Sequence, residues 1–199
     1  MKILLIGGTG LLGSGVKKEL EGRHEIICAA RNNADVEVDI SKPDSIKKMF
    51  EQVGKVDAVI SATGSTHFGP LKEMTPEMNE ITIENKLKGQ INLLLLGMDY
   101  VNDNGSFTLT TGILMDEPIY CGASAAMANG GVTAFAKTAA AEAPRGIRIN
   151  TVSAGVFQES SEELRGLFPG FDPVPLKKVA LSFRKSVEGI QTGQNYKIY

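Results

Sequence analysis

The chain has 199 residues, of which 42% are hydrophobic and 22% charged, as in an ordinary globular protein. A formal net charge of −2 gives no reason to expect nucleic acid or an anionic membrane as a partner. Two cysteines are too few for a disulfide framework and match no metal-ligand spacing, so we expect no metal site. With no bilayer-spanning apolar stretch and no signal-peptide pattern, we expect one cytoplasmic domain over residues 1–199.

An apolar run at residues 3–6 predicts a buried first strand, and a glycine-rich turn follows it. Gly7, Gly10 and Gly13 are spaced three apart, and Leu12 and Val16 then mark one face of a helix. A strand, a tight turn and a helix N-terminus in this order form a site for a phosphate group. The three glycines would let the chain turn, a pyrophosphate approach and the helix pack closely. We favour a dinucleotide-binding turn over the alternative, a structural turn without a ligand.

Strand-like and helix-like patterns alternate through the rest of the chain, which predicts a doubly wound α/β fold with a parallel sheet of about seven strands. Further strands are expected at residues 25–30, 36–39, 56–61, 107–111, 147–152 and 196–199. Helices are expected at residues 41–54, 75–98, 123–142 and 179–187, with Ser41 as a cap, a turn at 102–105 and an irregular segment at 159–175. Only the short polar link 31–35 separates the second and third strands, so one crossover helix is missing.

Taken together, the motifs resemble those of the short-chain dehydrogenase/reductase family over nearly the whole chain. The motifs are the glycine turn at residues 7–13, Asp39, Ser-Ala-Thr-Gly at 61–64, Asn85, Gly-Ser-Phe at 105–107 before Thr110-Thr111, and the stretches 131–137, 148–155 and 192–194. The resemblance implies a sheet in Rossmann strand order, with the cofactor lying across its carboxyl edge.

The resemblance also implies where the parts of the cofactor lie. The glycine turn would wrap the pyrophosphate, Asp39 and Ile40 would lie beside the adenine, and residues 62–64 would pass along the adenosine ribose. Residues 153–156 would face the nicotinamide. The implied cofactor-binding residues are Gly7, Thr9, Gly10, Leu12, Gly13, Arg31, Asp39, Ile40, Ala62, Thr63, Gly64, Asn129, Ser153, Ala154, Gly155 and Val156.

Arg31 favours NADP over NAD as the cofactor. An acid at the end of the second strand would bind the 2′-hydroxyl of NAD, but Ala29 and Ala30 stand there and Arg31 follows them. A guanidinium group can hold a 2′-phosphate through a bidentate, charge-assisted contact. The alternative is a solvated loop arginine with no ligand.

The family's catalytic tyrosine, and the lysine four residues after it, are both missing. An alignment anchored on Gly131-Val132 places Ala125 and Asn129 at these positions. In the family the tyrosine donates a proton to the substrate carbonyl, and the lysine lowers the pKa of the tyrosine and holds the nicotinamide ribose. Asn129 can still bind the ribose by a hydrogen bond, but it cannot supply the positive charge.

Four residues remain as candidates for the chemistry. Thr110 or Thr111 would replace the family's serine, although either can be only a β-branched strand residue. Asn85 matches the family's fourth catalytic member, or it only stabilises its helix. His67, in the loop after the fourth strand, is a guess for a proton donor, and a loop histidine without a role is the alternative.

Two functions fit this pattern. The first is an atypical NADP(H)-dependent oxidoreductase with a degenerate catalytic site and an unknown small-molecule substrate. The alternative is a non-catalytic NADP(H)-binding sensor or regulatory protein, which the missing tyrosine and lysine favour. The alanine-rich helix 123–142 and the helix near 76–98 also predict a homodimer.

Overall fold

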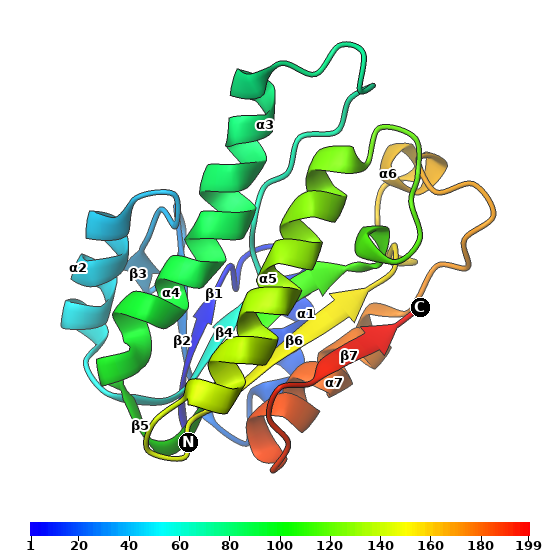
Figure 1. The fold of residues 1–199 in the computed structure, drawn as a ribbon. Coiled ribbons are helices and arrows are strands. Elements are labelled where there is room, and N and C mark those ends of the chain that lie inside the picture. The colour runs from blue at the N-terminus through cyan, green and yellow to red at the C-terminus, as the bar shows by residue number, and fades with distance from the viewer.

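The computed structural model describes all 199 residues and contains one seven-stranded parallel sheet in the order β3-β2-β1-β4-β5-β6-β7 (Figure 1). Alternating apolar strands and amphipathic helices produce this doubly wound Rossmann arrangement, which confirms the predicted fold class. The strands are β1 (Lys2–Ile6), β2 (Glu25–Ala30), β3 (Val36–Glu37), β4 (Val56–Ser61), β5 (Val101–Gly112), β6 (Arg148–Ala154) and β7 (Asn195–Ile198).

Helices cover both faces of the sheet (Figure 1). One face is covered by α1 (Leu11–Leu20) and α7 (Leu176–Glu188). The other face is covered by α2 (Pro43–Val53), α4 (Gly89–Gly97) and α5 (Ala123–Glu142). The remaining elements are α3 (Pro76–Thr82), the π-helical turn η1 (Ile83–Lys88), the 3₁₀ turns η2 (Met98–Tyr100) and η3 (Ile113–Met115), and the short helix α6 (Glu162–Gly166).

Two apolar layers hold these helices to the sheet. Phe50 of α2 and Leu93 of α4 are fully buried against Phe107 of β5 on one face. On the other face, Val16 of α1 and Phe183 of α7 are fully buried over the sheet. Burial of this kind contributes about 1.5–3 kcal/mol for each large apolar side chain. Both layers therefore fix the strand ends that carry the site.

The connection between β2 and β3 contains no helix, as the sequence predicted. β3 pairs in parallel with β2, with Ala29 opposite Val36 and Ala30 opposite Glu37. The link 31–35 therefore runs directly over the carboxyl end of β2, and Arg31 stands exposed at that edge.

Two local predictions differ from the structure in detail. Helix α2 begins at Pro43 rather than at Ser41, because the Ser41 hydroxyl donates to Asp39 Oδ1 at 2.7 Å instead of capping the helix. Residues 102–105 lie within β5 but form a bulge in it: Val101 pairs with Val56 and Ser106 with Ala58, and Asn104 has a φ of 61°. The Asn104 N–H donates to the Arg145 carbonyl oxygen at 2.9 Å, so the predicted turn is a bulge inside the strand and not a link between two elements.

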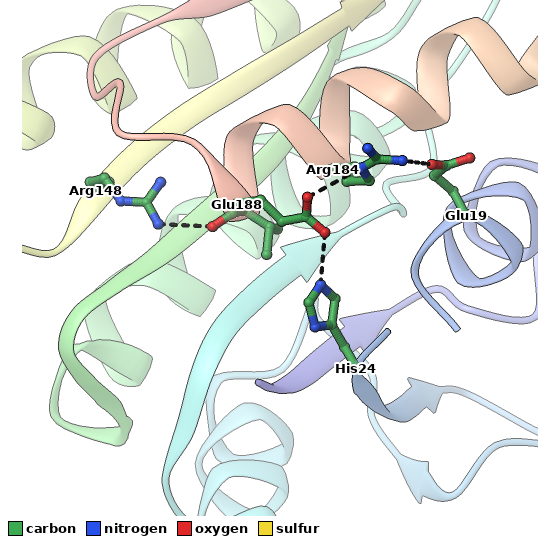
Figure 2. A network of polar contacts seen from close by, with 6 residues as sticks. Glu19, His24, Arg148, Arg184 and Glu188 are labelled. Carbon is green, nitrogen blue, oxygen red and sulfur yellow. Dashed lines mark hydrogen bonds and ion pairs between the residues drawn. The ribbon is translucent and has the colours of Figure 1, made fainter. Parts of the chain in front are cut away.

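An ion-pair network joins α7 to α1 and to the turn before β2, at the amino ends of the strands (Figure 2). Arg184 of α7 pairs with Glu19 of α1 at 2.7 Å and with Glu188 at 3.2 Å. Glu188 Oε1 lies 3.0 Å from His24 Nε2, and Arg148 donates two hydrogen bonds to backbone carbonyls at the end of α7. The network lies at the edge opposite the glycine turn, so it contributes to the scaffold and not to the site.

Candidate functional site

The glycine-rich turn between β1 and α1 forms one wall of the site, and contacts within the protein require two of its glycines. Gly7 has a φ of 84°, and a Cβ there would lie 2.6 Å from the Ala62 carbonyl oxygen. A Cβ on Gly13 would lie 2.0 Å from the Gly7 carbonyl oxygen. A Cβ on Gly10 would meet only that same oxygen, at 3.5 Å, which is an ordinary contact. Since Gly10 lines the cavity described next, its missing side chain leaves room for a ligand.

The first cavity has a volume of about 440 Å³ and lies at the carboxyl ends of β1, β2 and β4. A crevice at this edge of a doubly wound sheet is where such folds bind nucleotides. It contains many of the predicted cofactor residues. Its lining is Ile6, Gly7, Thr9, Gly10, Ala30, Arg31, Asn32, Asn33, Val38, Asp39, Ile40, Ala62, Thr63, Ser65 and Asn85.

Arg31 and Asp39 give the first cavity one cationic and one anionic wall. Arg31 takes part in no ion pair within the chain, so its guanidinium is available to an anion. The Ser41 hydroxyl donates to Asp39 and holds the pKa of that carboxyl below its usual value, so Asp39 is ionised at neutral pH. A free cation, an acceptor and an open glycine turn fit a phosphorylated adenine dinucleotide.

Two further cavities continue along the carboxyl edge. The second has a volume of about 250 Å³ and shares Ala62 and Thr63 with the first. The third, of about 220 Å³, shares Gly155 with the second. The second is lined by Leu12, Ala62, Thr63, Gly64, Lys86, Thr110, Thr111, Ala154, Gly155 and Phe157. The third is lined by Ile113, Glu117, Gly155, Val156, Pro169, Gly170, Phe171, Asp172 and Tyr199.

The two predicted catalytic threonines line the second cavity, but both hydroxyls are bonded to backbone carbonyls. Thr110 Oγ1 donates to the Ser61 carbonyl oxygen at 2.5 Å, and Thr111 Oγ1 donates to that of Val152 at 3.4 Å. Asn85 lies elsewhere: it lines the first cavity, and its Nδ2 donates to the Ile81 carbonyl oxygen at 3.0 Å. The structure therefore does not bring Asn85 together with the threonines.

Ala125 and Asn129 lie one helical turn apart on α5, and both are 3% exposed. Ala125 packs with Ile113 and Leu114 in a small apolar cluster. Asn129 faces the end of β5, where a Cβ on Gly112 would lie 3.2 Å from its Nδ2. Its Oδ1 is buried without a hydrogen-bond partner, a state that costs about 1–3 kcal/mol. Neither side chain can donate a proton to a substrate.

Lys86 is a residue of the second cavity that the sequence reasoning missed. It lies in η1, the π-helical turn, and its chain packs against Gly64, where a Cβ would be 3.1 Å from Lys86 Cγ. The neighbouring Lys88 pairs with Glu84 and Glu80, whereas no acid pairs with Lys86. Burial therefore lowers the pKa of Lys86 to about 8.

The π-helical turn explains why Lys86 was missed. A π turn adds one residue to the helical repeat, so the residues after it point in other directions than a regular α-helix would give. The helix predicted for residues 75–98 is present without a break, but its repeat is π-helical at Ile83–Lys88. The pair Asn85-Lys86 does mark two polar side chains at this point, but nothing in the sequence indicates which one faces the sheet edge.

Ser153 differs in its surroundings from the neighbouring residues expected near the nicotinamide. Ala154 and Gly155 line the second cavity, and Val156 lines the third. The Ser153 hydroxyl instead lies 2.8 Å from the Tyr199 hydroxyl, which in turn donates to Asp116 Oδ2 at 2.6 Å. Burial and the hydrogen bond to Asp116 raise the pKa of Tyr199. Tyr199 is therefore a weak proton donor.

Other kinds of site find no support in the arrangement. No group of three or more histidine, cysteine, aspartate or glutamate side chains is placed to hold a metal ion. None of the helices has both the length and the apolar character that crossing a bilayer requires. Cys28 and Cys121 are both free.

Comparison with known proteins identifies the family. A sequence model of the family described as enoyl-(acyl carrier protein) reductase matches residues 7–173. The chain belongs to the short-chain dehydrogenase/reductase family. It is 65% identical to the protein lin1944 from Listeria innocua, and the two structures align over 100% of both chains with a TM-score of 0.99. A search of curated proteins found no match.

More distant solved structures share the fold. A small-chain dehydrogenase in complex with NADPH is 22% identical and aligns with 99% of this chain and 95% of that chain, at a TM-score of 0.88. A short chain dehydrogenase/reductase family protein is 16% identical and aligns with 100% of this chain and 95% of that chain, at a TM-score of 0.89. The seven-stranded sheet is thus the fold of this family.

Proposed function

We propose that the protein is an NADP(H)-dependent oxidoreductase that acts on a small carbonyl compound. The observation that carries the proposal is the row of three adjoining cavities along the carboxyl edge of the sheet, with a free arginine at one end. Bound NADPH supplies a hydride, and the chain's own residues bind and orient the reactants. The 22%-identical dehydrogenase in complex with NADPH supports this choice of cofactor.

Each part of the row suits a part of the cofactor. Gly7, Thr9, Gly10 and Gly13 would hold the pyrophosphate at the start of α1 through backbone contacts. The Arg31 guanidinium would bind the 2′-phosphate, and Asp39 would accept a hydrogen bond from the adenine amino group, with Ile40 beside the ring. The second cavity would receive the nicotinamide and the carbonyl group of a small substrate, and the third would receive the rest of the substrate, with Gly155 between them.

Arg31 supplies the direct test of the cofactor. A charge-assisted contact to the 2′-phosphate contributes about 1.5–3 kcal/mol, so NADPH should bind roughly 10- to 150-fold more tightly than NADH. Isothermal titration calorimetry on Arg31→Glu should show this preference lost. The charge-matched control Lys48→Glu, on the exposed side of α2, should leave it intact. Tighter binding of NADH by the wild-type protein would contradict the assignment.

A second function is also a candidate, because the sequence alignment places Ala125 and Asn129 at the positions of the family's tyrosine and lysine. A protein that binds NADP(H) without turnover would act as a sensor or regulatory partner. The two functions differ in one readout, which is NADPH oxidation in the presence of aldehydes, ketones and quinones. NADPH binding without oxidation above background favours the sensor.

We further propose that two copies associate through α4 and α5, and that the protein works in the cytoplasm. Exposed apolar side chains on these helices support a self-complementary interface: Leu95 is 59% exposed and Met127 is 39% exposed. The two free thiols suit the reducing cytoplasm. Sedimentation velocity at micromolar concentration tests the association, and a monomer would count against it.

A further inference from the structure

Reduction of a carbonyl group requires a proton for its oxygen as well as a hydride for its carbon. The family's tyrosine is absent, so another group has to supply this proton if turnover occurs. Lys86 is the only ionisable side chain among the residues that line the second cavity. The rest of that lining is apolar, glycine or threonine.

The helix geometry holds Lys86 in this position. The widened turn η1 brings Lys86 toward the ends of β4, β5 and β6, while Glu84 and Lys88 of the same turn pair with each other at the surface. Gly64, with a φ of 135°, follows β4 and leaves space for the methylene chain of Lys86. The side chain is thus packed along its stem, and Lys86 lines the cavity.

The other protic groups near the cavity are poorer candidates for the proton donor. The hydroxyls of Thr110 and Thr111 donate to backbone carbonyls, and the Tyr199 hydroxyl donates to Asp116. His67 lines none of the three cavities, and its Nε2 packs closely on Gly69. Thr63 also lines the second cavity, but its hydroxyl is an alcohol and too weak an acid to protonate a carbonyl oxygen, which leaves Lys86 as the acid of this lining.

The charges around Lys86 leave its amine a stronger acid than an exposed lysine. No charged group from β4, β5, β6, α1 or the segment after β6 lines the second cavity beside it. Arg31 and Asp39 lie at the first cavity, and Glu84 and Lys88 are paired with each other. Desolvation therefore acts without an opposing carboxylate and lowers the pKa of Lys86 to about 8. At pH 7 the amine is still mostly protonated, so it carries a proton to give.

We propose that Lys86 is the catalytic acid of this site, and that it protonates the oxygen of an aldehyde or ketone substrate. The assignment rests on the proposed oxidoreductase function. In the balanced reaction, a carbonyl compound, NADPH and a proton give an alcohol and NADP⁺. The C=O double bond becomes C–O–H: the carbon gains the hydride, and the oxygen takes a proton from the Lys86 Nζ ammonium. The neutral amine that remains regains a proton from water.

Kinetics on matched variants test the proposal. The probes are NADPH with 4-nitrobenzaldehyde, butane-2,3-dione or 9,10-phenanthrenequinone. Lys86→Met should lower kcat about 10²–10⁴-fold, the usual contribution of general acid catalysis. Lys88→Met, two residues along the same turn, should stay within about twofold, because removal of a surface ion pair has little effect. Lys86→Arg keeps the charge but titrates far too high to act as the acid, so it should also be slow.

The pH profile has a defined direction. A general acid works only while it is protonated, so wild-type kcat should fall as the pH rises through about 8. The kcat of Lys86→Met should not show this fall near pH 8. Circular dichroism checks that each variant is folded, and Lys86→Gln replaces the methionine variant if that one is not.

A second measurement does not depend on turnover. Protein labelled with ¹³C-lysine is titrated by NMR, and the Lys86 Cε resonance is assigned by its absence from Lys86→Arg. Lys86 should titrate near pH 8, whereas ordinary lysines titrate near 10.4. Titration of Lys86 together with the other lysines would overturn the assignment.

The outcomes separate this assignment from the proposed function. If the wild-type protein oxidises NADPH with a probe and Lys86→Met does so at the same rate and pH dependence, the assignment is wrong and the oxidoreductase function stands. If the wild-type protein oxidises NADPH with none of the probes, the reductase function fails and the catalytic role of Lys86 fails with it. Loss of rate in Lys86→Met together with titration near pH 8 supports both.

Discussion

The glycine turn gives a paired prediction, because Gly10 and Gly13 differ in what surrounds them. Alanine at Gly13 would place a Cβ 2.0 Å from the Gly7 carbonyl oxygen, and real contacts essentially never fall below 3.0 Å. The obstacle is backbone, so α1 itself has to move. Overpacking of this kind costs about 3 kcal/mol, and the higher helix propensity of alanine offsets about 1 kcal/mol. We expect a net loss of about 2 kcal/mol of unfolding free energy.

Gly10→Ala should behave in the opposite way. Its backbone, with φ −81° and ψ 174°, is open to alanine, and the new Cβ would meet only one atom at 3.5 Å. We expect its stability to stay within about 1 kcal/mol of wild type, since the lower entropy of the unfolded chain and the weaker N-cap nearly cancel. NADPH binding should nevertheless weaken, because the Cβ enters the first cavity.

Thermal unfolding followed by circular dichroism, with NADPH titration on the same samples, measures both effects. For a chain of this size, 2 kcal/mol corresponds to a fall in Tm of about 4–8 °C for Gly13→Ala. Gly10→Ala should keep its Tm and lose affinity. Equal Tm losses for the two variants, or an unchanged Tm for Gly13→Ala, would refute this account of the turn.

Three further predictions concern the scaffold and the association of two copies. Phe183→Ala should cost about 3–5 kcal/mol in urea unfolding, because the ring is fully buried between α7 and the sheet. The Asn102 hydrogen bond lowers the pKa of Asp57 in the folded protein. The Asp57 carboxylate therefore stabilises the fold above its unfolded pKa near 3.9, and this stabilisation is lost as the pH falls through the lower folded pKa. In scans of Tm against pH, Asp57→Asn should therefore show a smaller fall in Tm at acid pH than the wild-type protein. Met127→Glu should convert the proposed dimer to monomer in sedimentation velocity.

The fold could be predicted because its signals are local. The apolar run at residues 3–6 and the turn after it required only neighbouring residues, and the link 31–35 is too short to hold a crossover helix that covers the sheet. The two local differences have different causes. The Ser41 hydroxyl binds Asp39, only two residues before it, and this local bond competes with the helix cap. The bulge at residues 102–105 is held within β5 by a bond from Asn104 to the Arg145 carbonyl, a partner far along the chain that no local pattern reveals.

Only part of the site could be predicted, because only part of it depends on local sequence patterns. Backbone motifs such as the glycine turn carry their role in their spacing, and they line the first cavity as expected. The direction in which a side chain points from a helix depends on the helical repeat, and the π-helical turn changes that repeat. Asn85 therefore lies at the first cavity and Lys86 at the second, although the two are adjacent in sequence.

Transfer of deuterium is the measurement that tests the central claim most directly. The protein is incubated with NADPH that carries two deuterium atoms at C4 of the nicotinamide and with 4-nitrobenzaldehyde or butane-2,3-dione, and the product is analysed by mass spectrometry. An NADP(H)-dependent oxidoreductase should give an alcohol that carries one deuterium on the former carbonyl carbon. NADPH binding with no deuterium in any product would contradict the claim and leave the non-catalytic sensor.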